Sequence, residues 1–128
     1  MSESLDYRAL ANEFWKLIDM ARSSTLRYRN TLKKMDRQQL IDYYWQYEET
    51  AGFLKSPPYT IRLKGMSNDQ VDDIATWLVA QGEDAYTRVL RDPEQMPRTI
   101  PRPVKVLDDV VREYRRRFHD DIPFPDNA

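Results

Sequence analysis

Residues 66–92 carry the signals of a complete helix and, directly after it, of a second helix. Ser67 or Asn68 is expected to cap the first N-terminus, and the aspartates that follow suit the positive end of a helix dipole. Apolar residues recur at helical spacing as far as Gly82, which predicts a left-handed stop. The second helix is expected to end at Asp92, because a residue that precedes proline avoids the α conformation. We therefore expect the rest of the chain to be organised around this helical pair.

Four further stretches repeat apolar residues at the spacing of a helix. They are residues 7–21, 26–34, 37–54 and 104–119. Asp36 and Gln39 match a capping box at the start of the third stretch. The apolar content of residues 26–34 is thin. The pattern predicts an all-α, single compact domain of about five helices, with loose tails at residues 1–6 and 120–128.

Prolines mark the two main breaks between these helices. Pro57-Pro58 ends the third stretch, and residues 59–63 then alternate in polarity as a strand would. Because no second strand is present to pair with them, we expect an extended connection. Residues 92–103 hold four of the eight prolines. They predict a stiff connector that crosses the surface and delivers the last helix to a distant face.

The chain length and composition bound the class of protein. The 128 residues fit one domain, with enough apolar surface for a core without disulfides or metals. There is no cysteine, which excludes thiol chemistry and fits a reducing cytoplasm. The N-terminus does not read as a signal peptide, and no apolar run approaches the roughly 18 residues of a membrane span. We expect a soluble, cytoplasmic protein with no membrane partner.

The charge balance argues against nucleic acid as a partner. Twenty basic and 21 acidic side chains leave a formal net charge of −1, whereas nucleic-acid binding needs a basic surface or patch. One basic cluster leaves an alternative function open, that of a nucleic-acid-associated regulator. This alternative requires that the basic residues of the cluster share one face without intervening carboxylates. Its members are Arg112, Arg115, Arg116 and Arg117, with Lys33 and Lys34. A salt-bridged surface accounts for the same residues, since acidic residues stand close by throughout.

Residues that could carry catalysis are few. The single histidine, His119, stands at a helix end, where a solvated imidazole suits the dipole. Neither a phosphate-binding glycine loop nor a metalloprotease helix motif is present. Glu48, Asp72 and Asp108 would make a magnesium site only if they converged in space, and helix capping and solvated faces explain them more simply. We expect a protein that is not an enzyme and that has no cofactor or metal.

Aromatic residues are abundant, with three tryptophans and eight tyrosines. Tryptophan, tyrosine and arginine dominate the energetic centres of protein interfaces, although core packing is the simpler explanation for the tryptophans. Residues 43–47 place aromatic side chains nearly all round one helix, so some should reach the surface. We expect this helix and the proline-broken loop to form one exposed patch that binds a partner. Its predicted members are Tyr43, Trp45, Tyr47, Tyr59 and Arg62.

Several stretches resemble a known bacterial family. Residues 12–22, Asn-Glu-Phe-Trp-Lys-Leu-Ile-Asp-Met-Ala-Arg, are similar to the Phe-Trp opening and Leu-Ile-Asp continuation of domain-of-unknown-function family 4240. The similarity resumes at residues 65–69 and runs through the Trp-Leu-x-x-x-Gly helix end at residues 77–82 to Asp92-Pro93. The final helix is similar in position and length. The resemblance implies a small helical bacterial protein and carries no established activity.

Many small, acidic, cysteine-free helical proteins of bacteria serve as immunity proteins that neutralise toxins. The composition is compatible with that role. We therefore predict a non-enzymatic bacterial protein-binding module, such as an immunity protein that masks a toxin. A protein partner is expected, and self-association through the aromatic surface stays open.

Overall fold

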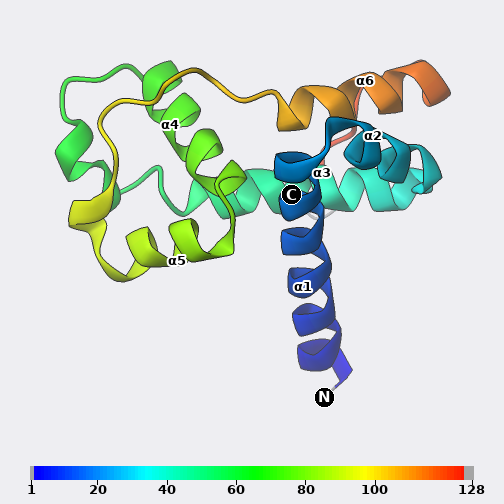
Figure 1. The fold of residues 1–128 in the computed structure, drawn as a ribbon, viewed down its shortest axis with the longest axis horizontal. Coiled ribbons are helices and arrows are strands. Elements are labelled where there is room, and N and C mark those ends of the chain that lie inside the picture. Colours follow the sequence, from blue (N-terminus) through cyan, green and yellow to red (C-terminus); the bar gives the residue numbers. More distant parts are fainter. Residues whose placement is uncertain (1, 126–128) are drawn as a thin grey trace.

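The computed structural model describes residues 2–125 of the chain, with side chains from residue 12 onward. Over that range the fold is all-helical, as predicted, and has six α-helices, two 3₁₀ helices and no strand (Figure 1). The α-helices are α1 (Ser2–Ser23), α2 (Thr25–Lys34), α3 (Arg37–Gly52), α4 (Asn68–Ala80), α5 (Glu83–Arg91) and α6 (Val106–Phe118). The 3₁₀ helices are η1 (Tyr59–Leu63) and η2 (Pro93–Gln95).

Helix α3 is the central element of this fold. It packs against α1, α4 and α6. In Figure 1, α4 and α5 lie at one end of the molecule and α2 and α6 at the other, and α1 crosses α3 between them. The α4–α5 pair, which the sequence marks most clearly, is therefore one of two groups that α3 joins. It is not the element around which the whole chain packs.

The helix boundaries follow the capping signals in the sequence. The Ser24 hydroxyl accepts a hydrogen bond from the backbone N–H of Arg27 at the start of α2. Capping boxes begin both α3, through Asp36 and Gln39, and α4, through Ser67 and Gln70. These side chains satisfy N–H groups that have no partner within the helix. Gly82 separates α4 from α5 with a φ of 104°, a left-handed conformation that favours glycine.

Helix α1 begins at Ser2, so residues 2–6 are helical and do not form the loose tail expected from the sequence. No glycine or proline interrupts residues 2–23, and the helix can therefore extend to its first described residue. At the other end α6 stops at Phe118, and residues 120–125 are not helical. Residue 1 and residues 126–128 lie outside the described part of the chain.

Residues 59–63 form the 3₁₀ helix η1, and the predicted extended connection was wrong. The Pro57-Pro58 bond is cis, and the turn that follows is closed by local hydrogen bonds. The backbone N–H of Tyr59 donates to the carbonyl oxygen of Ser56, and that of Ile61 donates to Pro58. The polarity pattern of this segment has a different origin from a strand, because Leu63 is buried while Ile61, two positions before it, is exposed.

The connector before α6 has the course that its prolines predict. After the short η2 turn, residues 96–105 contain no helix and run along the surface to the far end of the molecule (Figure 1). Met96 anchors the connector because its side chain is buried in the core. The connector thereby brings α6 against α2 and α3, although α6 follows α5 in the chain.

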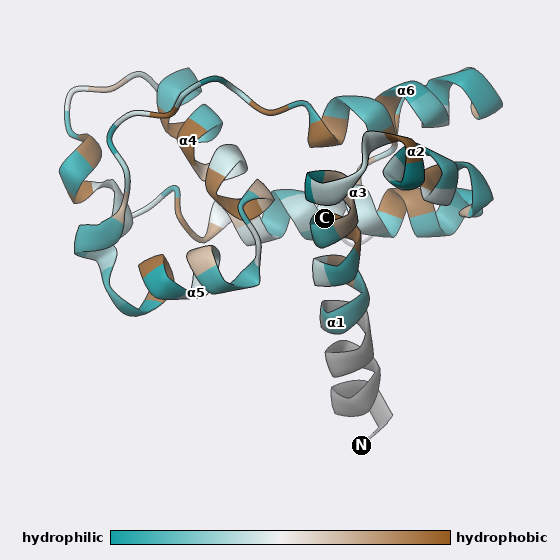
Figure 2. Ribbon diagram, viewed as in Figure 1, coloured by the Kyte–Doolittle hydropathy of each residue, from teal (hydrophilic) through white to brown (hydrophobic). Residues whose placement is uncertain are grey.

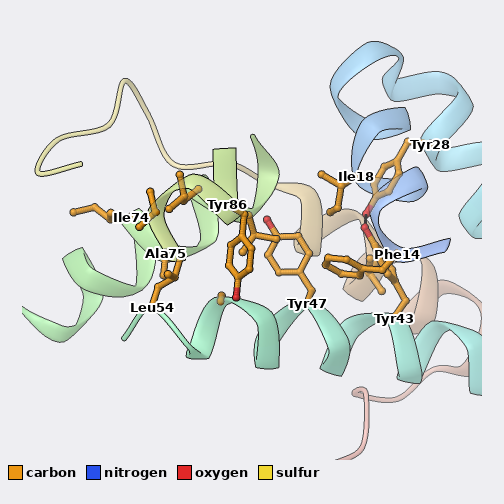
Figure 3. Close-up of a cluster of buried hydrophobic side chains, with 14 of the residues drawn as sticks. Phe14, Ile18, Tyr28, Tyr43, Tyr47, Leu54, Ile74, Ala75 and Tyr86 are labelled. Carbon is orange, nitrogen blue, oxygen red and sulfur yellow. Dashed lines mark hydrogen bonds between the residues drawn. The ribbon is translucent and has the colours of Figure 1, made fainter. Parts of the chain in front are cut away.

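A continuous cluster of buried side chains runs along α3 (Figure 3). The labelled members in Figure 3 are Phe14, Ile18, Tyr28, Tyr43, Tyr47, Leu54, Ile74, Ala75 and Tyr86. The tyrosines among them keep their hydroxyl groups paired, which avoids the cost of burying an unsatisfied polar group. The Tyr47 hydroxyl donates to the carbonyl oxygen of Thr76, and the Tyr86 hydroxyl to that of Thr50, both at 2.7 Å.

Candidate partner-binding surface

Two members of the predicted aromatic patch lie in the core. Tyr43 and Tyr47 point inward from α3 and are 3% and 0% exposed. They point the same way because residues four apart share one face of a helix. Tyr43 contacts the ring of Phe14, and so does Tyr47. The folded protein therefore cannot offer either side chain to a partner, and the expectation of a single exposed patch was wrong.

Tyr59 and Arg62 lie in η1, at the end of the molecule farthest from α2 (Figure 1). Tyr59 is half-buried, and its hydroxyl donates to the carbonyl oxygen of Leu90 at 3.0 Å. Arg62 is exposed and donates to the carbonyl oxygen of Glu94. Both side chains thus tie η1 to the end of α5 and to η2. They are not brought together with Trp45 by any contact that the structure records among residues 12–125.

Trp45 remains at the surface, in the middle of three aromatic rings. It is half-buried on α3, with its ring centroid 5.1 Å from Tyr44 and 5.4 Å from Phe124. Its indole N–H donates to the carbonyl oxygen of Pro123 at 2.7 Å, which fixes the C-terminal segment against α3. Phe124 itself is 77% exposed. We call Tyr44, Trp45 and Phe124 the aromatic row.

Two members of the aromatic row were not among the predicted site residues. The buried face of α3 passes through Tyr43 and Tyr47, and Tyr44 is therefore only half-buried and reaches the surface. Phe124 lies in the segment expected to be a loose tail. The sequence signal that could have found it is the run Pro123-Phe124-Pro125, because prolines restrict the backbone around an otherwise unexplained apolar residue.

Carboxylates surround the aromatic row. Asp42 and Glu49 are exposed and lie one helical turn before and after Trp45, on the same side of α3. Tyr44 lines a hollow of about 230 Å³ together with Asp72, Asp73 and Asp108, between α3, α4 and α6. Partial burial, with the nearby negative charges of Glu48 and Asp72, raises the pKa of the Tyr44 hydroxyl above its usual value. The surroundings of the row are therefore acidic.

The three carboxylates considered for a metal site are only partly brought together. Asp72 and Asp108 line the same hollow, and Asp72 forms an ion pair with Lys55. Burial and the charge of Asp72 raise the pKa of Glu48, although Lys55 opposes the shift. Among the described residues, no three histidine, aspartate or glutamate side chains are placed to hold a metal ion.

The arginines of the alternative function do not form a face free of carboxylates. Each pairs with an acidic side chain: Arg112 with Asp109, Arg115 with Asp121, and both Arg116 and Arg117 with Glu113. This arrangement contradicts the requirement that we set for a nucleic-acid-binding face.

His119, the single histidine, is exposed in the left-handed conformation that ends α6, with a φ of 55°.

Comparison with known proteins gives the chain a family. No helix of the described residues is long and apolar enough to cross a bilayer. Neither the curated proteins nor the solved structures contain a match to the chain. Residues 11–115 match the family described as "Protein of unknown function (DUF4240)". This match includes the Phe-Trp opening, the Trp-Leu helix end and most of α6. The chain therefore belongs to domain-of-unknown-function family 4240.

Proposed function

We propose that this chain is a non-enzymatic module that binds and masks a protein partner through the aromatic row. The observation that carries this proposal is the contact of Tyr44, edge-on, and Phe124, tilted, with the ring of Trp45 between them at the surface. A central tryptophan with aromatic neighbours is typical of the few residues that supply most of the affinity of an interface. Tryptophan also presents a large rigid surface at a low cost in conformational entropy.

The acidic surroundings of the row determine the kind of partner. Asp42 and Glu49 flank Trp45, and the adjoining hollow adds Asp72, Asp73 and Asp108. Opposite charges across an interface accelerate association and reject like-charged proteins. The partner is therefore a basic protein surface that places an apolar or aromatic side chain against Trp45. An immunity protein that masks a basic toxin is one protein of this kind.

The test is co-purification from the native cells with a tagged chain and matched variants. We expect one basic protein to be recovered in stoichiometric amount with the natural sequence, and to be lost with Trp45→Ala or Phe124→Ala. Leu26→Ala is the control, because Leu26 is an exposed apolar residue on α2, at 70% against 77% for Phe124. This control should keep the partner. Toxicity of the recovered protein when it is expressed alone would support the immunity role.

A second pair of variants tests the charge argument. Glu49→Gln should slow association with the recovered partner, whereas Glu83→Gln, which removes an exposed carboxylate from α5, should not. Recovery of the chain alone, or of nucleic acid that a salt wash removes, would contradict the proposal. Equal loss of the partner with Trp45→Ala and Leu26→Ala would also contradict it, since binding would then not depend on the aromatic row.

A further inference from the structure

A second surface feature, distinct from the aromatic row, is a groove between α2 and α6. Its volume is about 410 Å³, within the range of pockets that hold small molecules. The residues that line it are Arg29, Leu32, Lys33, Asp109, Arg112, Glu113 and Arg116. We call this set the arginine groove. Both helices present hydrophilic outer turns there (Figure 2).

The two carboxylates lie deep in the groove and hold the guanidinium groups in place. Asp109 is 13% exposed, and one of its oxygens lies 3.3 Å from nitrogens of both Arg29 and Arg112. Glu113 is 8% exposed and accepts two hydrogen bonds from Arg116, at 2.6 and 3.3 Å. The cations stand above these carboxylates, with at least half of each ion-paired arginine side chain exposed.

The groove carries an excess of positive charge. Four cationic side chains face two carboxylates, on a chain whose formal net charge is −1. Arg29 and Arg112 share one carboxylate oxygen, so two like charges are held close together and only one negative charge offsets them. Lys33 has no ion pair among the described residues and adds a further uncompensated charge. A bound anion would relieve this repulsion.

The guanidinium groups also have donors to spare. A guanidinium has five N–H donors in a fixed fork that matches carboxylate and phosphate oxygens. Arg29 and Arg112 each direct a single terminal nitrogen to Asp109, which leaves the other terminal nitrogen of each for a ligand. Helix spacing aligns these donors, because Arg29 and Lys33 are four residues apart, and so are Arg112 and Arg116.

We infer that the arginine groove is a binding site for a small molecule that carries a phosphate or diphosphate group. Asp109 and Glu113 orient the arginine side chains. The terminal nitrogens of Arg29 and Arg112 that do not face Asp109, and the ammonium group of Lys33, bind the phosphate oxygens. Leu32 supplies an apolar wall for the rest of the ligand. If the groove were only a salt bridge network that joins α2 to α6, it would not respond to such an anion.

The experiment is an NMR titration of the ¹⁵N-labelled full chain with inorganic pyrophosphate at low ionic strength. We expect saturable shifts of the amide signals of α2 and α6, and none at the aromatic row. Lys33→Gln, which leaves both ion-pair networks intact, should weaken binding about tenfold, the usual effect of one lost hydrogen bond to a charged group. Arg112→Gln should do the same. Arg102→Gln removes an exposed arginine from the connector and should leave the affinity unchanged.

Two further arms identify the source of the phosphate. Tighter binding of a nucleoside diphosphate than of pyrophosphate would assign the site to an organic diphosphate, and equal affinity would assign it to the diphosphate group itself. Three results would overturn the inference. The first is the absence of saturable shifts, and the second is equal weakening by Arg102→Gln. The third is tighter binding of a single-stranded oligonucleotide with a steep salt dependence, which would assign the groove to nucleic acid.

Discussion

The hydroxyl oxygens of Tyr28 and Tyr43 lie 3.0 Å apart in the core (Figure 3), and the Tyr28 hydroxyl donates to the carbonyl oxygen of Val106 at 3.1 Å. Because the single phenolic proton of Tyr28 goes to Val106, Tyr43 is the donor to Tyr28. Tyr28 belongs to α2, Tyr43 to α3 and Val106 to the start of α6. One buried phenol therefore joins two consecutive helices to a third that lies far along the chain.

The two tyrosines of this pair should contribute unequally to stability. Tyr28→Phe leaves the buried Tyr43 hydroxyl without a partner and removes the bond to the Val106 carbonyl oxygen, and should lower the free energy of unfolding by about 2–3 kcal/mol. Tyr43→Phe leaves the bond from Tyr28 to Val106 intact and should cost about 1 kcal/mol. Urea denaturation of both variants measures the difference. Equal losses would contradict the hydrogen-bond order described above.

The buried tyrosines also predict alkaline unfolding. Burial raises the pKa of Tyr28, Tyr43 and Tyr47 above the ordinary value of 10.0. Above that pH the unfolded chain loses phenolic protons that the folded chain keeps, so the unfolded state is favoured as pH rises. The stability due to this shift is fully present below pH 10 and is lost above it, by about 1.4 kcal/mol per pH unit for each tyrosine.

Urea denaturation at a series of pH values tests this expectation. The free energy of unfolding should change little from tyrosine ionisation between about pH 7 and 9 and should fall steeply above about pH 10. Tyr43→Phe removes one of the ionising groups, so its slope above pH 10 should be shallower than that of the natural sequence. A slope that is the same in the variant would show that other groups cause the loss.

Gly82 and Gly52 should respond in opposite directions to alanine. Gly82 has a φ of 104°, and an added Cβ would lie 2.8 Å from a terminal nitrogen of Arg22. Gly82→Ala should therefore destabilise the protein by about 1–2 kcal/mol. Gly52 ends α3 with helical geometry and open space around it, so Gly52→Ala should be neutral or stabilise by up to about 1 kcal/mol. Thermal unfolding of the two variants checks the signs.

Trp45 should restrict the backbone motion of the segment that follows α6. Its indole N–H bond to Pro123 and its contact with Phe124 hold this segment on α3, beside the packing of Ile122 against the core. Trp45→Ala removes both, and the heteronuclear NOE values of the Ile122 and Phe124 amides should fall. Trp45→Phe keeps an aromatic ring against Phe124 and should show a smaller change. The melting temperature should shift little, because Trp45 is only half-buried. Unchanged NOE values would show that other contacts hold the segment.

The helices could be predicted from the sequence because their signals are local. Asp36 and Ser67 cap the helices that they precede, and Asp92 follows the end of α5 before a proline, as expected. The 3₁₀ turn at residues 59–63 was missed because alternating polarity over five residues fits two short structures equally well. The central position of α3 could not be derived either, since it depends on which faces of distant helices meet.

The candidate surface could be predicted only in part, for a similar reason. Aromatic residues on nearly all sides of α3 indicate that some must be exposed, and Trp45 is. Which ones are exposed depends on the direction from which α1 and α4 approach, and that direction decides that Tyr43 is buried and Tyr44 is not. The contact between Trp45 and Phe124 joins residues 79 positions apart by the numbering, and no local pattern signals it.

The connector that carries α6 back to α2 also sets the order in which the protein can assemble. Tyr28 donates to a carbonyl group 78 residues further along the chain. During synthesis the phenol of Tyr28 therefore emerges long before its acceptor has been made. Contacts of such long range slow folding, because the intervening chain must be ordered first. Until α6 has been translated, an emerging chain exposes the surface of α2 that α6 will cover, and a chaperone that binds such surfaces would find its target there.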